Sequence, residues 1–307
     1  MSATICIVDC PEDANSAEGV VEVINYAMEA AKKNNKGKII HAHEIELEKI
    51  QTAKSIEKIV KDAIAADTIM VYYQPIYSVK KKCYNSAEAL ARLYDEKLGW
   101  IPPDVFITTA EKCGLIIELG ELILHKVCRF IKENELSKST VEYIEVNVSP
   151  LQLMQKGFAD KMLGIMKQYD VAPSQINVEI TETAMMASFA IVDENLTKLI
   201  DNKIAISLDD YGSGYATINY INKIPFELIK IDRMIIQDAF KERKAGITLA
   251  HTVSMLNALE LSIVAEGVET EDMRDILIDF GCQYLQGWYY SKAVSETEFM
   301  QLINKGA

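Results

Sequence analysis

From residue 69 onward, short apolar runs rich in β-branched and aromatic residues alternate with longer amphipathic segments. This alternation constrains the fold most, because each run has the length of a strand and each longer segment has the spacing of a helix that covers a sheet. Eight such runs favour an α/β fold, a closed TIM-like (β/α)8 barrel, over an open sheet. The expected strands are 69–79, 84–91, 143–148, 176–181, 205–208, 228–231, 262–265 and 284–289.

The residues that flank the longer segments are those that begin and end helices. Pro103 suits the first turn of a helix. Thr270 stands before two acidic residues and Gly281 follows the same segment, which predicts a helix between them. Ser295, with Glu298 three residues later, predicts a capping box that opens the last helix.

The first 66 residues follow a different pattern. A strand over 3–8, a helix over 13–35 and a second strand from Gly37 cannot build much of a core alone, so we expect the end of a domain that begins outside this sequence. A Glu- and Lys-rich segment with one apolar face follows and predicts a connecting helix. The expected organisation is an appendage over 1–45, the connecting helix over 46–66 and the barrel over 67–307.

Composition excludes several classes of protein. A net charge of −13 argues against binding to a DNA or RNA polymer, which requires a basic face. Apolar runs are too short to span a membrane, and the N-terminus lacks the pattern of a signal peptide. The six cysteines are dispersed without a C-x-x-C pair, which is typical of reduced thiols in a cytoplasmic protein.

Polar residues interrupt or end one predicted strand after another. Any one of them alone is more often simply exposed, and two aspartates before Tyr-Gly are often only a turn. In a barrel, however, the carboxyl ends of the strands meet at one mouth, where active sites lie. The recurrence on successive strands therefore indicates a site. Its candidate residues are Glu88, Asn147, Glu179, Glu182, Asp209, Asp210, Lys230, Asp232, Glu266, Glu269 and Gln286.

The chemistry of this set points to divalent cations. Oxygen ligands without histidine or cysteine suit Mg²⁺ or Mn²⁺ rather than zinc, and the four histidines fall outside the set. Clustered carboxylates would repel one another unless cations neutralise them. Two such cations stabilise the attacking and leaving oxygens of a displacement at phosphorus, and Lys230 would add positive charge or position a water. The spacing thus predicts metal-dependent cleavage of a phosphoester.

Over roughly residues 67–304, the motifs resemble those of the EAL-domain cyclic di-GMP phosphodiesterases. The motifs are Tyr73-Gln74-Pro75, Glu88-Ala89-Leu90 with Arg92, Pro103-Asp104-Val105-Phe106-Ile107, Ala110-Glu111, Asn147-Val148-Ser149, Glu179-Ile180-Thr181-Glu182, Asp209-Asp210-Tyr211-Gly212, Lys230-Ile231-Asp232, Ala265-Glu266-Gly267-Val268-Glu269 and Gln286-Gly287. The resemblance implies a barrel whose first strand is antiparallel, and hydrolysis of cyclic di-GMP to linear pGpG with two divalent cations, Mg²⁺ or Mn²⁺.

The resemblance also implies a role for each site residue. It assigns Glu88, Asn147, Glu179 and Asp209 to the first metal, and Asp209, Asp210 and Glu266 to the second. Lys230 would orient the nucleophilic water, and Glu182 would hold the loop after Asp210. Glu269 and Gln286 would support the site. The substrate-binding residues would be Gln74, Leu90, Arg92, Asp232 and Gln286.

Departures from the family pattern are modest and remove no metal ligand. Tyr211, Ser213, Ala216, Thr217 and Lys292-Ala293 stand where the family more often has other residues, which bears on rate and on the loop after Asp210. We expect a homodimer in which partner contacts bias this loop.

Residues 1–45 resemble the end of a GGDEF domain without its signature, which implies a longer signalling protein with an upstream GGDEF or sensor region. The alternatives are a receptor that binds cyclic di-GMP without cleaving it, and an unrelated metallohydrolase on the same fold.

Overall fold

The computed structural model describes residues 5–13, 16–17, 19–21, 23–24, 39–41, 47–181, 190–212, 221 and 223–305. The chain divides into two compact units, Met1–Asp62 and Ala63–Ala307. The predicted helix over 13–35, Glu182 and the loop from Ser213 to Thr217 lie wholly or mostly outside the described residues. None of the described helices has the length and apolar character needed to cross a bilayer.

The first unit contains a short parallel pair of strands. Strand β1 (Ile5–Ile7) pairs with β2 (Ile39–His41), with Ile5 opposite Ile39. Helix α2 (Leu47–Ala65) follows where the sequence predicts a helix. The two strands agree with those expected near residues 3–8 and after Gly37.

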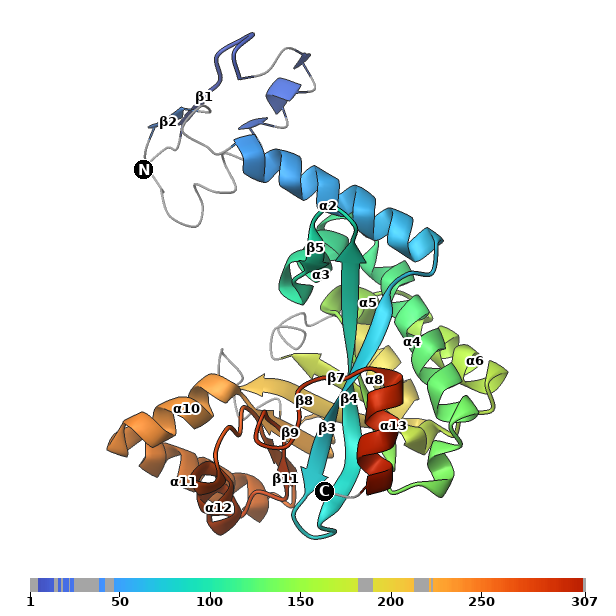
Figure 1. Ribbon diagram of the computed structural model, residues 1–307, viewed down its shortest axis with the longest axis vertical. Helices are drawn as coiled ribbons and strands as arrows, with labels where there is room; N and C mark the ends of the chain where they lie inside the picture. The colour runs from blue at the N-terminus through green and yellow to red at the C-terminus, as the bar shows by residue number, and fades with distance from the viewer. Residues whose placement is uncertain are drawn as a thin grey trace. The chain divides into compact units, whose positions relative to one another are not determined.

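The second unit is a closed barrel of eight strands, as the sequence predicts (Figure 1). Strand β3 is antiparallel to both of its neighbours, β4 and β11, so the reversed strand is the first of the barrel. All the other neighbours within the barrel are parallel. The strands are β3 (Met70–Ser78), β4 (Cys83–Asp95), β6 (Tyr143–Asn147), β7 (Ile176–Thr181), β8 (Ala205–Tyr211), β9 (Leu228–Ile231), β10 (Ser262–Ala265) and β11 (Tyr284–Leu285).

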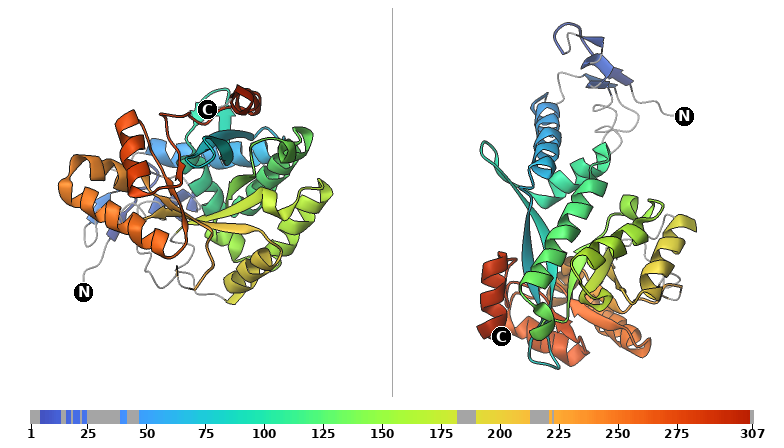
Figure 2. Two further views of the ribbon diagram at one scale, coloured as in Figure 1. Left: turned by 90° about the horizontal axis from the view of Figure 1, so that it is seen from below. Right: turned by 90° about the vertical axis from the view of Figure 1, so that its right-hand side faces the viewer.

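Helices surround the strands of this barrel, as Figure 2 shows. The described helices and helical turns are α3 (Pro103–Cys113), α4 (Ile116–Glu133), η2 (Leu136–Lys138), α5 (Pro150–Leu153), α6 (Phe158–Gln168), η3 (Pro173–Gln175), α8 (Ala190–Asp201), α10 (Arg233–Lys241), α11 (Arg243–Ala258), α12 (Glu271–Phe280) and α13 (Glu296–Lys305). Strand β5 and helices α3 and α4 follow the β3–β4 hairpin and lead to β6, which is parallel to β4.

The predicted helix ends are confirmed. Pro103 occupies the first turn of α3, and Gly281 ends α12 with a left-handed backbone at φ 99°. The Thr270 hydroxyl accepts a hydrogen bond from the Met273 N–H at 3.2 Å. At the start of α13, the Glu298 carboxylate accepts the Ser295 N–H at 3.0 Å. Such caps satisfy backbone donors that have no partner inside the helix.

The core of the barrel unit lies between the strands and the surrounding helices. Buried residues from helices, such as Phe130 of α4 and Leu249 of α11, belong to the same core cluster as buried apolar strand residues such as Ile176. Each such side chain contributes about 1.5–3 kcal/mol on burial. This packing fixes the strands, so the polar side chains that point into the barrel are held at defined positions.

One strand was not predicted. Residues Gly99–Ile101 form β5, which pairs antiparallel with the outer end of β4. Strand β4 is longer than predicted and ends at Asp95, and Glu88 lies in its interior as expected. Strand β11 is shorter than predicted, because the chain turns after Leu285 toward Gly287.

Candidate active site

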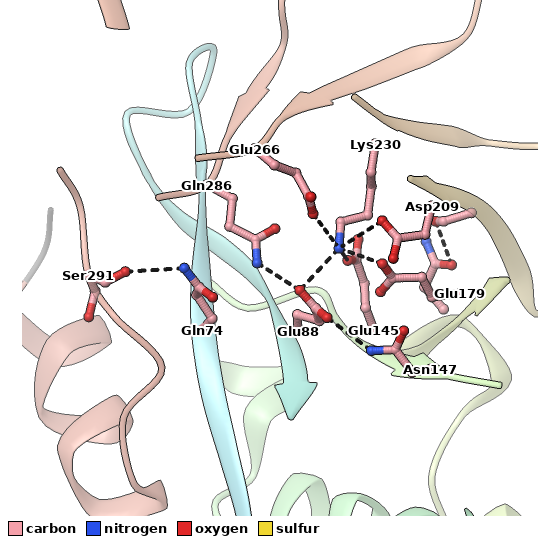
Figure 3. A network of polar contacts seen from close by, with 12 residues as sticks. Gln74, Glu88, Glu145, Asn147, Glu179, Asp209, Lys230, Glu266, Gln286 and Ser291 are labelled. Carbon is pink, nitrogen blue, oxygen red and sulfur yellow. Dashed lines mark hydrogen bonds and ion pairs between the residues drawn. The ribbon is translucent and has the colours of Figure 1, made fainter. Parts of the chain in front are cut away.

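A single buried ammonium group lies at the centre of a carboxylate cluster. Lys230, on β9, is fully buried, and the carboxylates around it come from β4, β6, β7, β8 and the end of β10 (Figure 3). The distances from Lys230 Nζ are 2.5 Å to Glu179, 2.9 Å to Glu266, 3.1 Å to Glu88, 3.5 Å to Glu145 and 3.9 Å to Asp209. One positive charge therefore faces five carboxylates.

Glu88 receives the most hydrogen bonds in this cluster. Its carboxylate accepts Asn147 Nδ2 at 2.9 Å, Gln286 Nε2 at 2.8 Å and Lys230 Nζ at 3.1 Å. Burial alone would raise the pKa of Glu88, but the Lys230 charge and the two amide donors outweigh it and lower that pKa. Among the carboxylates of this cluster, Glu88 is therefore the one whose ionised form the surrounding side chains stabilise best.

The other carboxylates are poorly compensated. Burial, with the nearby Glu88 charge, holds the pKa of Glu179 well above its ordinary value. Burial also raises the pKa of Glu266 to about 8, with Asp209 and Glu88 adding repulsion. For Asp210, burial and the adjacent Asp209 raise the pKa to about 6. Without further positive charge, these groups take up protons more readily than ordinary carboxylates.

The cluster fits divalent cations by its own geometry. One oxygen each of Glu88, Glu179 and Glu266 lie within 4.8 Å of one another, which is close enough for three ligands to share an ion. Glu179 Oε2 and Asp209 Oδ1 are buried and have no hydrogen-bond donor. An all-oxygen set with unsatisfied acceptors and excess negative charge suits Mg²⁺ or Mn²⁺.

Half of the residues expected at the site by sequence line one cavity of about 230 Å³. Gln74 of β3 lies at its edge, where its Nε2 donates to the Ser291 carbonyl at 3.4 Å. The cavity is also lined by Glu88, Leu90, Asp209, Glu266, Glu269 and Gln286. The cavity thus offers carboxylates that suit cations together with amide and apolar groups that suit an organic ligand.

Two expected residues have evident structural partners. Asp232 caps helix α10, where its Oδ1 accepts the Met234 N–H at 2.7 Å. Glu269 accepts hydrogen bonds from Arg233 Nη2 at 2.8 Å and Gln237 Nε2 at 3.2 Å.

Among the described residues, two of the expected substrate contacts do not line the acidic cavity. Asp232 is not part of its lining, and Arg92 lines a separate hollow. Glu182 lies outside the described residues.

Gly287 shapes the rim of the cavity. A β-carbon at this position would lie 2.2 Å from the backbone of Val268, so only glycine permits this close approach. The backbone hydrogen bond from Val268 N–H to the Gln286 carbonyl, 3.0 Å long, lies next to this contact. The approach places Gln286 against Glu88 on one side and Trp288 at the rim on the other.

Sequence reasoning missed Glu145. It is fully buried, both of its carboxylate oxygens lack a hydrogen-bond donor, and burial raises its pKa to about 7, with added repulsion from Glu88 and Asp209. The sequence could have indicated it, because side chains two residues apart on a strand share a face, and Glu145 is two residues before the expected site residue Asn147. It also lies directly opposite Glu88 in the register of β4 and β6.

Comparison with known proteins places this chain in one family. The model of the EAL domain matches residues 57–293. The chain belongs to the EAL-domain family. It is 30% identical to the signaling protein YkoW of Bacillus subtilis over 98% of this chain and 38% of that protein. It is also 30% identical to the cyclic di-GMP phosphodiesterase RocR of Pseudomonas aeruginosa, over 75% of this chain and 58% of that protein.

Solved structures agree with this EAL fold. The phosphodiesterase PaMucR, in complex with c-di-GMP, superposes with a TM-score of 0.75 at 29% identity, over 80% of this chain and 99% of that chain. The EAL enzyme Bd1971 superposes with a TM-score of 0.79 at 22% identity, which supports the fold alone. The chain spans less than two-fifths of the length of YkoW and of the similar Synechocystis protein sll1895.

Proposed function

We propose that this EAL domain hydrolyses cyclic di-GMP to linear pGpG with two divalent cations, Mg²⁺ or Mn²⁺. The observation that carries the proposal is the buried cluster of Glu88, Glu179 and Glu266 around Lys230, with acceptor oxygens that lack donors. A domain that only binds the dinucleotide has no need of so many uncompensated buried carboxylates, which reduce stability unless cations are bound.

In this proposal, Glu88, Asn147, Glu179 and Asp209 would hold one cation, and Asp209, Asp210 and Glu266 would hold the other. Bound cations would supply the positive charge that offsets negative charge on the attacking and leaving oxygens. Lys230 keeps the carboxylates together and orients the attacking water. That water loses a proton as its oxygen forms a new P–O bond, one ring P–O bond breaks, and the leaving ribose oxygen takes up a proton.

The remaining side chains would bind and orient the dinucleotide. Arg92 offers a charged donor to a phosphate, and Gln74 offers an amide at the cavity edge. Leu90 provides apolar surface, Gln286 fixes Glu88, and Glu269 holds Arg233. We retain Asp232 as a substrate contact in the proposal, although its carboxylate also caps α10.

The wider organisation is also part of the proposal. Residues 67–307 would be the catalytic barrel, residues 46–66 a connecting helix, and residues 1–45 the end of a GGDEF-like domain in a longer cytoplasmic protein. We further propose a homodimer in which the loop after Asp210, held by Glu182, responds to partner contacts.

The test is turnover of cyclic di-GMP by the purified chain, with pGpG separated by chromatography. Activity should require Mg²⁺ or Mn²⁺, should be abolished by EDTA, and should be inhibited by Ca²⁺, which prefers longer bonds and more ligands. Glu194→Ala, an exposed position on α8, is the matched control for Glu88→Ala. Tight binding without turnover under all metal conditions would instead support the receptor alternative.

A further inference from the structure

A second hollow, of about 320 Å³, lies beside the acidic cavity on the outer parts of β3, β4 and β5. Its walls include Tyr72, Arg92, Trp100 and the pair Pro102–Pro103. Of these residues, sequence reasoning selected only Arg92 as a site residue. The hollow is mainly apolar, with one guanidinium group at its side, and so differs in character from the acidic cavity.

The register of β3 and β4 connects the hollow with the carboxylate cluster. Glu88, Leu90 and Arg92 alternate along β4 and therefore share one face. On β3, Gln74 is opposite Glu88 and Tyr72 is opposite Leu90. Because four residues of strand span about 13 Å, this face leads outward from the proposed metal ligand to Arg92. Leu90 lines the acidic cavity, and Arg92, two residues further out on this face, lines the hollow.

The aromatic groups of the hollow are open to a ligand. The Trp100 side chain is 54% exposed, and its ring meets the Tyr72 ring edge-on at 6.1 Å between centroids. Arg92 Cζ lies 5.7 Å from the centre of the Tyr72 ring. Exposed aromatic rings stack on nucleobases, and a guanidinium group binds phosphate. The combination of an aromatic surface with a neighbouring cation fits one base and one phosphate of a nucleotide.

We propose that Trp100 and Tyr72 form a binding subsite for a guanine base, next to a phosphate held by Arg92. This inference rests on the proposed function and adds the residues that recognise one half of the dinucleotide. Pockets for ligands of this size usually measure about 300–1,000 Å³. The acidic cavity, at about 230 Å³, falls below that range, and the hollow, at about 320 Å³, offers further space for one half of a ligand with two bases.

The test compares Trp100→Ala with Trp100→Phe and with Leu98→Ala. Leu98 lies on the same hairpin, is 51% exposed and does not line the hollow, so it is the matched control. Loss of one stacked base should raise the KM for cyclic di-GMP about ten-fold for Trp100→Ala, with kcat changed less than about two-fold. Trp100→Phe should keep the KM close to the wild-type value, and Leu98→Ala should match the wild type.

A second measurement separates this inference from the proposed function. Equilibrium binding of cyclic di-GMP is measured by calorimetry with Ca²⁺ in place of Mg²⁺, on the same variants and on Tyr72→Leu. One outcome is that neither the wild type nor any variant shows turnover, while Trp100→Ala and Tyr72→Leu bind cyclic di-GMP about ten-fold more weakly than Leu98→Ala. This outcome would support the subsite and contradict the proposed hydrolysis.

If turnover is present and Trp100→Ala equals Leu98→Ala in both KM and binding, the subsite is wrong. A change in the sedimentation mass of Trp100→Ala without a change in KM would show instead that the aromatic surface contacts a second copy of the chain, and would also overturn the inference. Should Trp100→Ala fail to fold, Tyr72→Leu and Trp100→Phe decide by the same comparison.

Discussion

Replacing Lys230 with methionine tests whether the carboxylate cluster is built for cations. The substitution keeps a long side chain but removes the ammonium that faces five carboxylates within 3.9 Å. Removing one partner of a buried ion pair costs about 3–5 kcal/mol, because the remaining charge stays buried. For a unit of this size, each kcal/mol lowers the Tm by about 2–4 °C, so a loss of roughly 6–20 °C is expected in EDTA.

Saturating Mg²⁺ should reduce that loss, because bound cations supply the missing positive charge. The assay is thermal unfolding at pH 8, followed by circular dichroism, with EDTA or with Mg²⁺. Lys126→Met is the control: Lys126 is also buried but pairs with Asp67 at 2.5 Å, away from the cluster. Its loss of Tm should be the same in both buffers. An equal loss for Lys230→Met in EDTA and in Mg²⁺ would refute the reasoning.

Further predictions concern the charges of the cluster and the contacts of the substrate. Glu88→Ala should lower kcat by at least about a hundred-fold at saturating Mg²⁺, whereas Arg92→Ala should mainly raise KM; steady-state assays that show near-normal kcat for Glu88→Ala would contradict the site. Glu145→Gln removes a negative charge near the proposed cations and should weaken the apparent Mg²⁺ affinity roughly ten-fold, about 1.4 kcal/mol, in a Mg²⁺ titration of activity. An unchanged midpoint would show that the charge of Glu145 does not contribute to Mg²⁺ binding. In EDTA, the folded pKa values of about 7 for Glu145 and about 8 for Glu266 exceed the ordinary 4.5, so the folded state binds more protons. Stability should therefore fall as pH rises from about 5 to 8, and a Tm that stays level or rises over this range would be inconsistent with the raised pKa values.

The barrel was predictable because its signal is spread over the whole chain. Alternating strand and helix patterns repeat from residue 69, and caps such as Thr270 and Gly281 add local agreement. The short β5 was missed because three residues carry too little periodicity to indicate a strand. Its pairing depends on the outer end of β4, which only the folded hairpin brings alongside.

Candidate site residues could be predicted where a polar residue interrupts an apolar run of the sequence. They were harder to predict where the assignment depends on whether the side chain is buried in the fold. Glu145 illustrates the difference, because a glutamate in a short strand is usually exposed. Only the register places it opposite Glu88 and beneath Lys230. The helix cap formed by Asp232 was not predicted for a similar reason, since a residue at the end of a strand can also begin the next helix.

The reversed β3 explains why the proposed substrate-binding residues Gln74, Leu90 and Arg92 lie on one hairpin. In an all-parallel barrel, the first strand would present its carboxyl end at the mouth. Because β3 runs the other way, its first half lies beside the outer half of β4, which places Gln74 opposite Glu88 and Tyr72 opposite Leu90. Strand β4 can then continue past the barrel to Asp95 and pair with β5. The same reversal that brings an amide to the proposed metal ligand therefore also builds the aromatic hollow beyond it.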